Sequence, residues 1–61
     1  MKVREIVRAM ERDGWYLDRQ PGSSHRQYKH PTKPNRITVA YKDSKDVSEW
    51  QARKMLNEAG L

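Results

Sequence analysis

The 61-residue chain contains no cysteine, which excludes a disulfide bridge and a zinc site with cysteine ligands. It also lacks any apolar run that approaches the roughly 20 residues needed to cross a bilayer. The opening MKVREIVRAM carries charges throughout and has no apolar segment of the kind found in secretory signal peptides. These absences lead us to expect a cytoplasmic protein without a membrane span.

Hydrophobic residues are scarce too, at 34% of the chain. A chain of 61 residues leaves room for one small domain, spanning residues 1–61, and not for two. A core of this size supports a free energy of unfolding of about 3–5 kcal/mol. The loss of a few buried contacts is therefore expected to unfold the protein.

Acidic residues are nearly missing from the middle of the chain. Between Arg19 and Lys45 there are seven basic residues and a single acid, Asp43, which gives this region a net charge of +6. The rest of the chain carries −1, so the excess positive charge is central. This distribution predicts a polyanion or an acidic protein as the partner. The alternative is charge that only keeps exposed strands soluble.

Two amphipathic segments predict helices at the two ends of the chain. Apolar residues at i, i+3, i+4 and i+7, followed by Gly14, predict a helix over residues 2–13. Ser48 and Gln51 have the spacing of a capping box and predict a second helix over residues 49–59. The residues expected to face the core are Val3, Ile6, Val7 and Met10 in the first helix and Ala52, Met55, Leu56 and Ala59 in the second.

Three segments between the helices predict strands. They cover residues 15–19, 25–30 and 36–41, with turns at residues 20–24 and 31–35. The order helix–strand–strand–strand–helix predicts an α+β fold with a three-stranded antiparallel sheet and both helices on one face. Double-stranded-RNA-binding domains share this order of elements.

Period-2 alternation divides the second predicted strand into two faces. Tyr28 is the only large apolar residue in this strand, so its face, with Arg26 and His30, is expected to meet the core. His25 and Lys29 then share the opposite, solvent-facing side.

His25 is the strongest candidate for catalysis, because an imidazole exchanges a proton near neutral pH and nearby cations can hold a phosphate. This combination suggests work on a phosphodiester backbone. The alternative is a histidine that only bonds the backbone at a strand start. His30 is not expected to be a second proton carrier, because it faces the other way. Two histidines on opposite faces, without a nearby carboxylate pair, predict neither a metal site nor another cofactor.

The surrounding residues predict contacts to phosphate. Lys29 is interpreted as holding the scissile phosphate or, alternatively, as an exposed strand lysine. Gly22, Ser23 and Ser24 are expected to form the turn and to offer backbone amides to a phosphate. The remaining cations interpreted as contacts to the nucleic-acid backbone are Arg26, Lys33 and Arg36.

Three stretches carry a resemblance that covers essentially the whole chain: VREIVRAMERDGWYL, GSSHRQYKHPTKPNRITVA and KMLNEAGL. The central one combines Gly-Ser, a histidine and a Tyr-Lys-His-Pro run in a fixed order. With these motifs the chain resembles the HicA-type toxins, small ribonucleases of bacterial and phage toxin–antitoxin pairs. It departs from the usual pattern in having Ser24 before the histidine and Trp50 at a position that is more often small or polar.

The resemblance implies a double-stranded-RNA-binding-like fold, cleavage of mRNA and neutralisation by a HicB-type antitoxin. It maps the family's catalytic histidine onto His25, which would act as a general acid or base in metal-independent cleavage through the 2′-hydroxyl of RNA. The alternative function is a non-catalytic RNA-binding module that uses the same basic face. Trp50 is expected to be exposed, where it would anchor the antitoxin.

Overall fold

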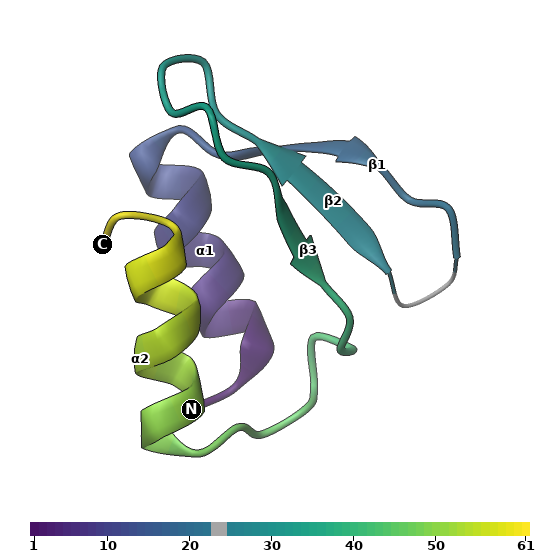
Figure 1. Cartoon of the computed structure of the whole chain (residues 1–61). Helices are drawn as coiled ribbons and strands as arrows, with labels where there is room; N and C mark the ends of the chain where they lie inside the picture. The colour runs from purple at the N-terminus through teal and green to yellow at the C-terminus, as the bar shows by residue number, and fades with distance from the viewer. Residues whose placement is uncertain (23–24) are drawn as a thin grey trace.

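The computed structural model of the chain describes residues 1–22 and 25–61. Along the chain, one helix precedes and one follows three strands, in the predicted order (Figure 1). The elements are α1 (Val3–Asp13), β1 (Tyr16–Arg19), β2 (Arg26–Lys29), β3 (Ile37–Val39) and α2 (Glu49–Glu58). Within the described part of the chain, no helix is long and apolar enough to span a membrane.

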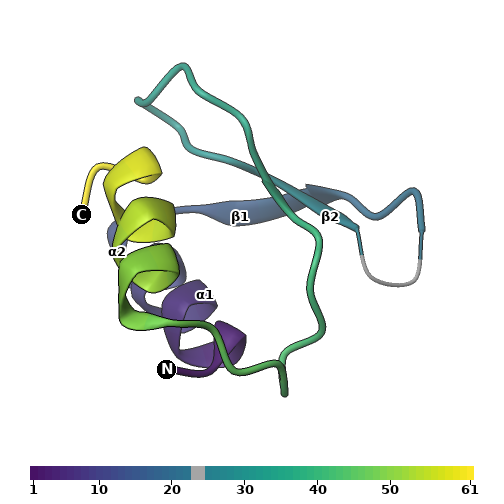
Figure 2. The ribbon, with the colours of Figure 1, turned by 60° about the horizontal axis from the view of Figure 1, so that its bottom comes forward.

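The three strands form one antiparallel sheet with β2 in the centre. Tyr28 on β2 pairs with Leu17 on β1 and with Ile37 on β3, and a bulge follows Leu17 in β1. Figures 1 and 2 show both helices on one face of this sheet, which leaves the other face open. The α+β fold with a double-stranded-RNA-binding-like layout is thus confirmed.

The core lies between the helices and the covered face of the sheet. The whole apolar stripe predicted for α1 is buried, and Trp15 is only 2% exposed. Ala52 in α2 and Ala59, directly after this helix, are buried. Met55 and Leu56 in α2 are half-buried and pack against the core. The sheet contributes Tyr28, Ile37 and Val39. The helical periodicity and the alternation around Tyr28 therefore predicted correctly which residues of the helices and of β2 face the core.

The strands are shorter than predicted. Trp15 and His30, at the ends of the predicted strands, contact the core and the neighbouring loop and do not take part in strand pairing. Trp15 precedes β1: its indole is buried, and Nε1 donates a hydrogen bond to the carbonyl of Ala59 at 3.2 Å. His30 follows β2, and the next residue is Pro31, which has no N–H to continue the strand pairing. β3 covers only Ile37–Val39 of the six residues predicted.

The start of α2 differs in one detail from the predicted capping box. Ser48 Oγ accepts a hydrogen bond from the amide of Gln51 at 3.1 Å, as the spacing predicts. The Gln51 side chain, however, donates to the hydroxyl of Tyr41 at 2.7 Å. Gln51 thereby connects α2 to the segment after β3, which helps to fix the helix on the sheet.

The loop between β2 and β3 is attached to the ends of both helices through His30 and Lys33, a pair of contacts that we call the helix-end clamp. The His30 side chain is only 8% exposed and packs edge-on against Trp15, with ring centroids 5.3 Å apart. Its Nε2 lies 2.7 Å from the carbonyl oxygen of Asp13, and its Nδ1 faces the amides of Thr32 and Lys33 at 3.1 and 3.2 Å. Because Nδ1 must accept from these amides, Nε2 carries the proton and donates to Asp13.

Lys33 makes the second half of the clamp. Its ammonium group donates to a carboxylate oxygen of Asp13, at the end of α1, and to the carbonyl of Ala59, at the end of α2, the latter at 2.8 Å. Glycines make room for both side chains. A Cβ added to Gly14 (φ 111°) would lie 2.9 Å from His30 Nε2, and one added to Gly60 (φ 76°) would lie 2.8 Å from Lys33 Nζ. Both glycines are also left-handed, a conformation that ends helices at low cost.

The clamp predicts an acid-sensitive contribution to stability. The hydrogen bond from Lys33 holds the pKa of Asp13 below its ordinary value of 3.8. A carboxylate with a lowered folded-state pKa stabilises the fold above its unfolded pKa, and this contribution is lost as the pH falls through the folded value. We expect Asp13→Asn to reduce the loss of stability between about pH 5 and pH 3, measured as the shift in the urea midpoint.

The Lys2–Asp46 ion pair provides a matched control, because it lowers the pKa of Asp46 in the same way. Asp46→Asn should remove a separate part of the acid dependence, and the double variant should lose both parts. An Asp13→Asn protein with the same acid dependence as the parent would show that the Lys33 contact does not stabilise the fold.

Candidate nucleic-acid interface

His25 lies immediately before β2 and is exposed. Among residues 1–22 and 25–61, none forms a hydrogen bond or ion pair with its imidazole. A Cβ added to Gly22 would lie 3.7 Å from His25 Nδ1, so the ring lies close to the backbone of Gly22. The predictions for Ser23 and Ser24 concern residues outside the described part of the chain.

The open face of the sheet continues from His25 along β2 through Gln27 and Lys29. Tyr28, between the last two, is buried, so alternation directs its neighbours toward solvent. The same alternation, extended by one residue before β2, assigns His25 to the face of Lys29. Arg36 reaches the same face and donates a hydrogen bond from Nη1 to Gln27 Oε1 at 3.4 Å.

Two of the cations predicted to contact phosphate, Arg26 and Lys33, instead bond other residues of the protein. Arg26 lies on the core side, its side chain 16% exposed, and donates to Asp43 Oδ1 at 2.7 Å and to the carbonyl of Tyr41 at 3.3 Å. Lys33 belongs to the helix-end clamp. The cations on the open face are held less firmly, since Lys29 lies 3.8 Å from Asp18 and Arg36 bonds only the neutral Gln27 among described residues.

The two histidines have different surroundings. His30 is enclosed by the clamp on the helix side, whereas His25 is exposed at the start of β2. No group of three or more histidine, aspartate or glutamate side chains that could hold a metal ion occurs among residues 1–22 and 25–61. The polar side chains of the open face therefore offer proton transfer at His25 and electrostatic attraction at Lys29 and Arg36.

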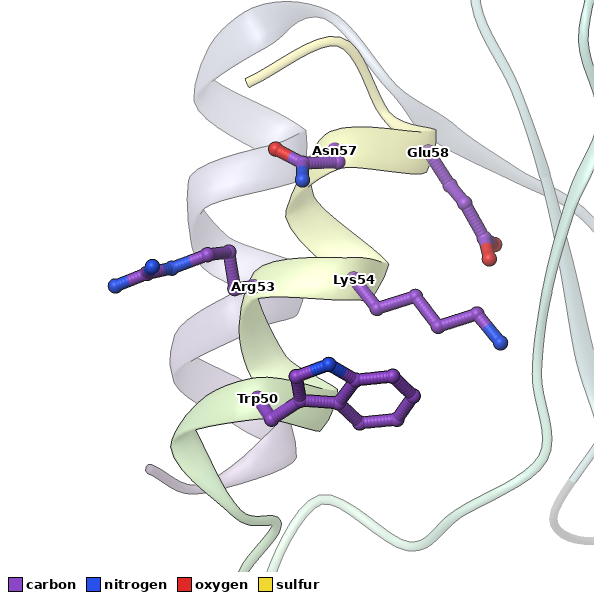
Figure 3. A pocket seen from close by; sticks show the side chains of 5 residues that line it. All are labelled: Trp50, Arg53, Lys54, Asn57 and Glu58. Atoms are coloured by element: carbon purple, nitrogen blue, oxygen red, sulfur yellow. The ribbon is translucent and has the colours of Figure 1, made fainter.

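A second surface is formed by residues of α2 and does not include His25. Trp50 is 73% exposed, as predicted, and Lys54 Nζ lies 5.6 Å from the centre of its indole ring. These side chains border an open hollow of about 460 Å³ (Figure 3). The other lining residues are Arg53, Asn57 and Glu58. Arg53 also bonds Glu49 at 3.4 Å, and α2 contains two basic and two acidic residues, so this surface lacks the excess positive charge of the sheet.

Sequence reasoning did not identify the helix-end clamp. Its contacts join residues 13, 33 and 59, which are far apart in the chain, and no local periodicity reports on such contacts. The available signal was weak: a glycine follows each helix, and His30 and Lys33 directly precede the two prolines of the β2–β3 loop.

Comparison with known proteins supports one assignment. One solved structure, described as "Toxin-Antitoxin complex from Streptococcus pneumoniae", contains a chain of the same fold, with a TM-score of 0.74 and 23% sequence identity over 100% of this chain and 98% of that chain. No curated protein matches the sequence significantly. The sequence profile described as "HicA toxin of bacterial toxin-antitoxin" matches residues 3–61, nearly the full length. The chain therefore belongs to the HicA toxin family of bacterial toxin–antitoxin systems.

Proposed function

We propose that this toxin is a metal-independent endoribonuclease that cleaves mRNA with His25 as a general acid or base. The observation that carries this proposal is an exposed imidazole at the start of β2, on a basic sheet face that the helices leave uncovered. The proposed substrate also places the activity in the cytoplasm.

The nucleophile is the 2′-hydroxyl of the RNA itself, so the protein has to supply only proton transfer and stabilisation of charge. The 2′-oxygen attacks the adjacent phosphorus and loses its proton, and the bond from phosphorus to the 5′-oxygen breaks as that oxygen gains a proton. His25 performs one of these two proton transfers, and a positioned group of this kind accelerates a reaction about 10²–10⁴-fold. Lys29 and Arg36 attract the RNA backbone to the open face. Backbone amides of residues 22–24 would stabilise the negative charge that develops on the scissile phosphate.

We further propose that a HicB-type antitoxin inhibits the toxin by covering the open face. The excess charge in residues 19–45 favours an acidic partner, because complementary charge accelerates association and selects the correct surface. The structurally similar chain from Streptococcus pneumoniae comes from a toxin–antitoxin complex. Trp50 offers an additional, apolar anchor on α2, of the kind that contributes strongly to protein interfaces.

The direct test is to incubate the purified protein with mRNA in EDTA and to follow the RNA on a gel. We expect cleavage that a HicB-type antitoxin suppresses. RNA binding without cleavage would support the alternative function, a non-catalytic RNA-binding module on the same face. If cleavage requires added metal, or if excess antitoxin leaves it unchanged, the corresponding part of the proposal is wrong.

A further inference from the structure

The loop between β2 and β3 surrounds a hollow of about 310 Å³ that is separate from His25. Its lining contains three cations, Lys29, Lys33 and Arg36, and no acidic residue. The other lining residues are His30, Pro31, Thr32, Pro34 and Asn35. The hollow therefore has the composition expected of an anion-binding site.

Lys29 and Arg36 face each other at the mouth of this hollow. Tyr28 and Ile37 are directly paired across β2 and β3, so the next pair along the same register is Lys29 and Arg36. Directly opposed residues have Cβ atoms about 4.5–5.5 Å apart, and like charges in such a pair are destabilising. Asp18, at 3.8 Å from Lys29, gives only partial compensation. An anion bound between the two side chains would relieve this repulsion.

The clamp gives the hollow a fixed shape. His30 Nδ1 accepts from two amides of the loop, and Lys33 attaches the loop to both helix ends. Pro31 and Pro34 further restrict the backbone. Lys29 and Arg36 are thus held on both sides of a preformed loop, and preorganisation of this kind reduces the entropic cost of binding.

The hollow is too far from His25 to contact the same phosphate. A strand rises about 3.4 Å per residue, so the distance from Arg26 to Lys29 alone is about 10 Å, and His25 precedes Arg26. His25 precedes β2 and the β2–β3 loop follows it, so the two lie at opposite ends of this strand (Figure 1). A stacked strand advances roughly 3.4 Å per nucleotide, so this span corresponds to about three to four nucleotides.

We propose that Lys29 and Arg36 form a phosphate subsite that binds the RNA backbone about three to four nucleotides from the bond at His25 and thereby sets a minimum substrate length. This inference rests on the proposed function, since it takes RNA as the ligand. A guanidinium and an ammonium group on both sides of a hollow suit a phosphodiester oxygen pair. The regular charge spacing of RNA lets one chain occupy this subsite and the His25 site together.

The test uses 2′-O-methyl oligonucleotides of two and of six residues, which lack the nucleophile and cannot be cleaved. Fluorescence anisotropy would give their Kd with the parent and with Lys29→Gln/Arg36→Gln. On the hexamer the double variant should bind about tenfold or more weakly, and the slope of log affinity against log salt should become shallower by about 0.7. The dimer cannot reach both sites and can still bind near His25, so its affinity should fall by much less than that of the hexamer. Arg53→Gln/Lys54→Gln is the matched control, because it removes the same charge from α2.

The outcomes separate this inference from the proposed function. Equal loss of hexamer affinity in both double variants, or a loss that is as large on the dimer, overturns the subsite. A variant that loses antitoxin affinity but keeps hexamer affinity assigns the pair to a protein interface and also overturns it. The parent protein could show the length-dependent binding and yet cleave no mRNA. This outcome would support the subsite and contradict the proposed nuclease function. Melting temperatures of both double variants verify that each is folded.

Discussion

His25→Ala is expected to lower the rate of RNA cleavage at least about 100-fold while leaving the protein folded. The imidazole is the group that we assign to proton transfer, and an alanine at this position can neither accept nor donate a proton. Stability should change by less than about 0.5 kcal/mol, because the side chain is exposed and bonds no other described residue. RNA affinity should largely persist, since Lys29 and Arg36 are unchanged.

Single-turnover cleavage in EDTA, the melting temperature and the Kd for a non-cleavable RNA measure these three effects. Gln27→Ala is the matched control, because Gln27 lies one step along the same face of β2 and has no proton to transfer near neutral pH. Folded His25→Ala protein that cleaves as fast as the parent would falsify the catalytic assignment. A similar rate loss in Gln27→Ala would instead indicate a general disturbance of the open face.

The sequence predicted those parts of the fold that repeat with a local period. The spacing of Val3, Ile6, Val7 and Met10 placed α1 and its buried stripe, because a helix returns to the same face every three to four residues. Tyr28, as the only large apolar side chain of β2, fixed which face of the sheet meets the core. These features depend on neighbouring residues alone, so no knowledge of the tertiary structure was needed.

The features that were missed depend on contacts between distant residues. Trp15 is predicted as the first residue of a strand, because aromatic residues favour strands, yet it precedes β1 and its indole bonds the carbonyl of Ala59, 44 residues away. Arg26 looks like one more exposed cation, but Asp43 binds it from beyond β3. Charge and composition therefore identified the basic region, whereas only the fold separates cations that serve the structure from those on the open face.

The two histidines also divide into one structural and one exposed residue. His30→Ala is expected to lower the stability of the fold, whereas His25→Ala is expected to lower the rate of cleavage. Removal of the His30 ring leaves the carbonyl of Asp13 and two loop amides without their partner, and takes away the edge contact with Trp15. The bonds to Asp13 and to the Lys33 amide are part-buried and the bond to the other amide is exposed, so each costs less than a fully buried group would, about 1–3 kcal/mol. Together with the lost ring contact, a loss of about 2–4 kcal/mol is expected. This is most of the free energy of unfolding expected for so small a core, about 3–5 kcal/mol.

The measurement is the melting temperature, which should fall by more than about 10 °C for a domain of this size. Two further variants show how much of the stability depends on the hydrogen bonds of Nδ1 and how much on that of Nε2. His30→Asn keeps an acceptor near the position of Nδ1, and His30→Gln keeps a donor near that of Nε2, so each should recover part of the lost stability. Cleavage, measured at a temperature where His30→Ala is still folded and corrected for the folded fraction, should stay within about tenfold of the parent. An unchanged melting temperature would show that the clamp does not stabilise the fold, and a folded variant as inactive as His25→Ala would place His30 in the chemistry.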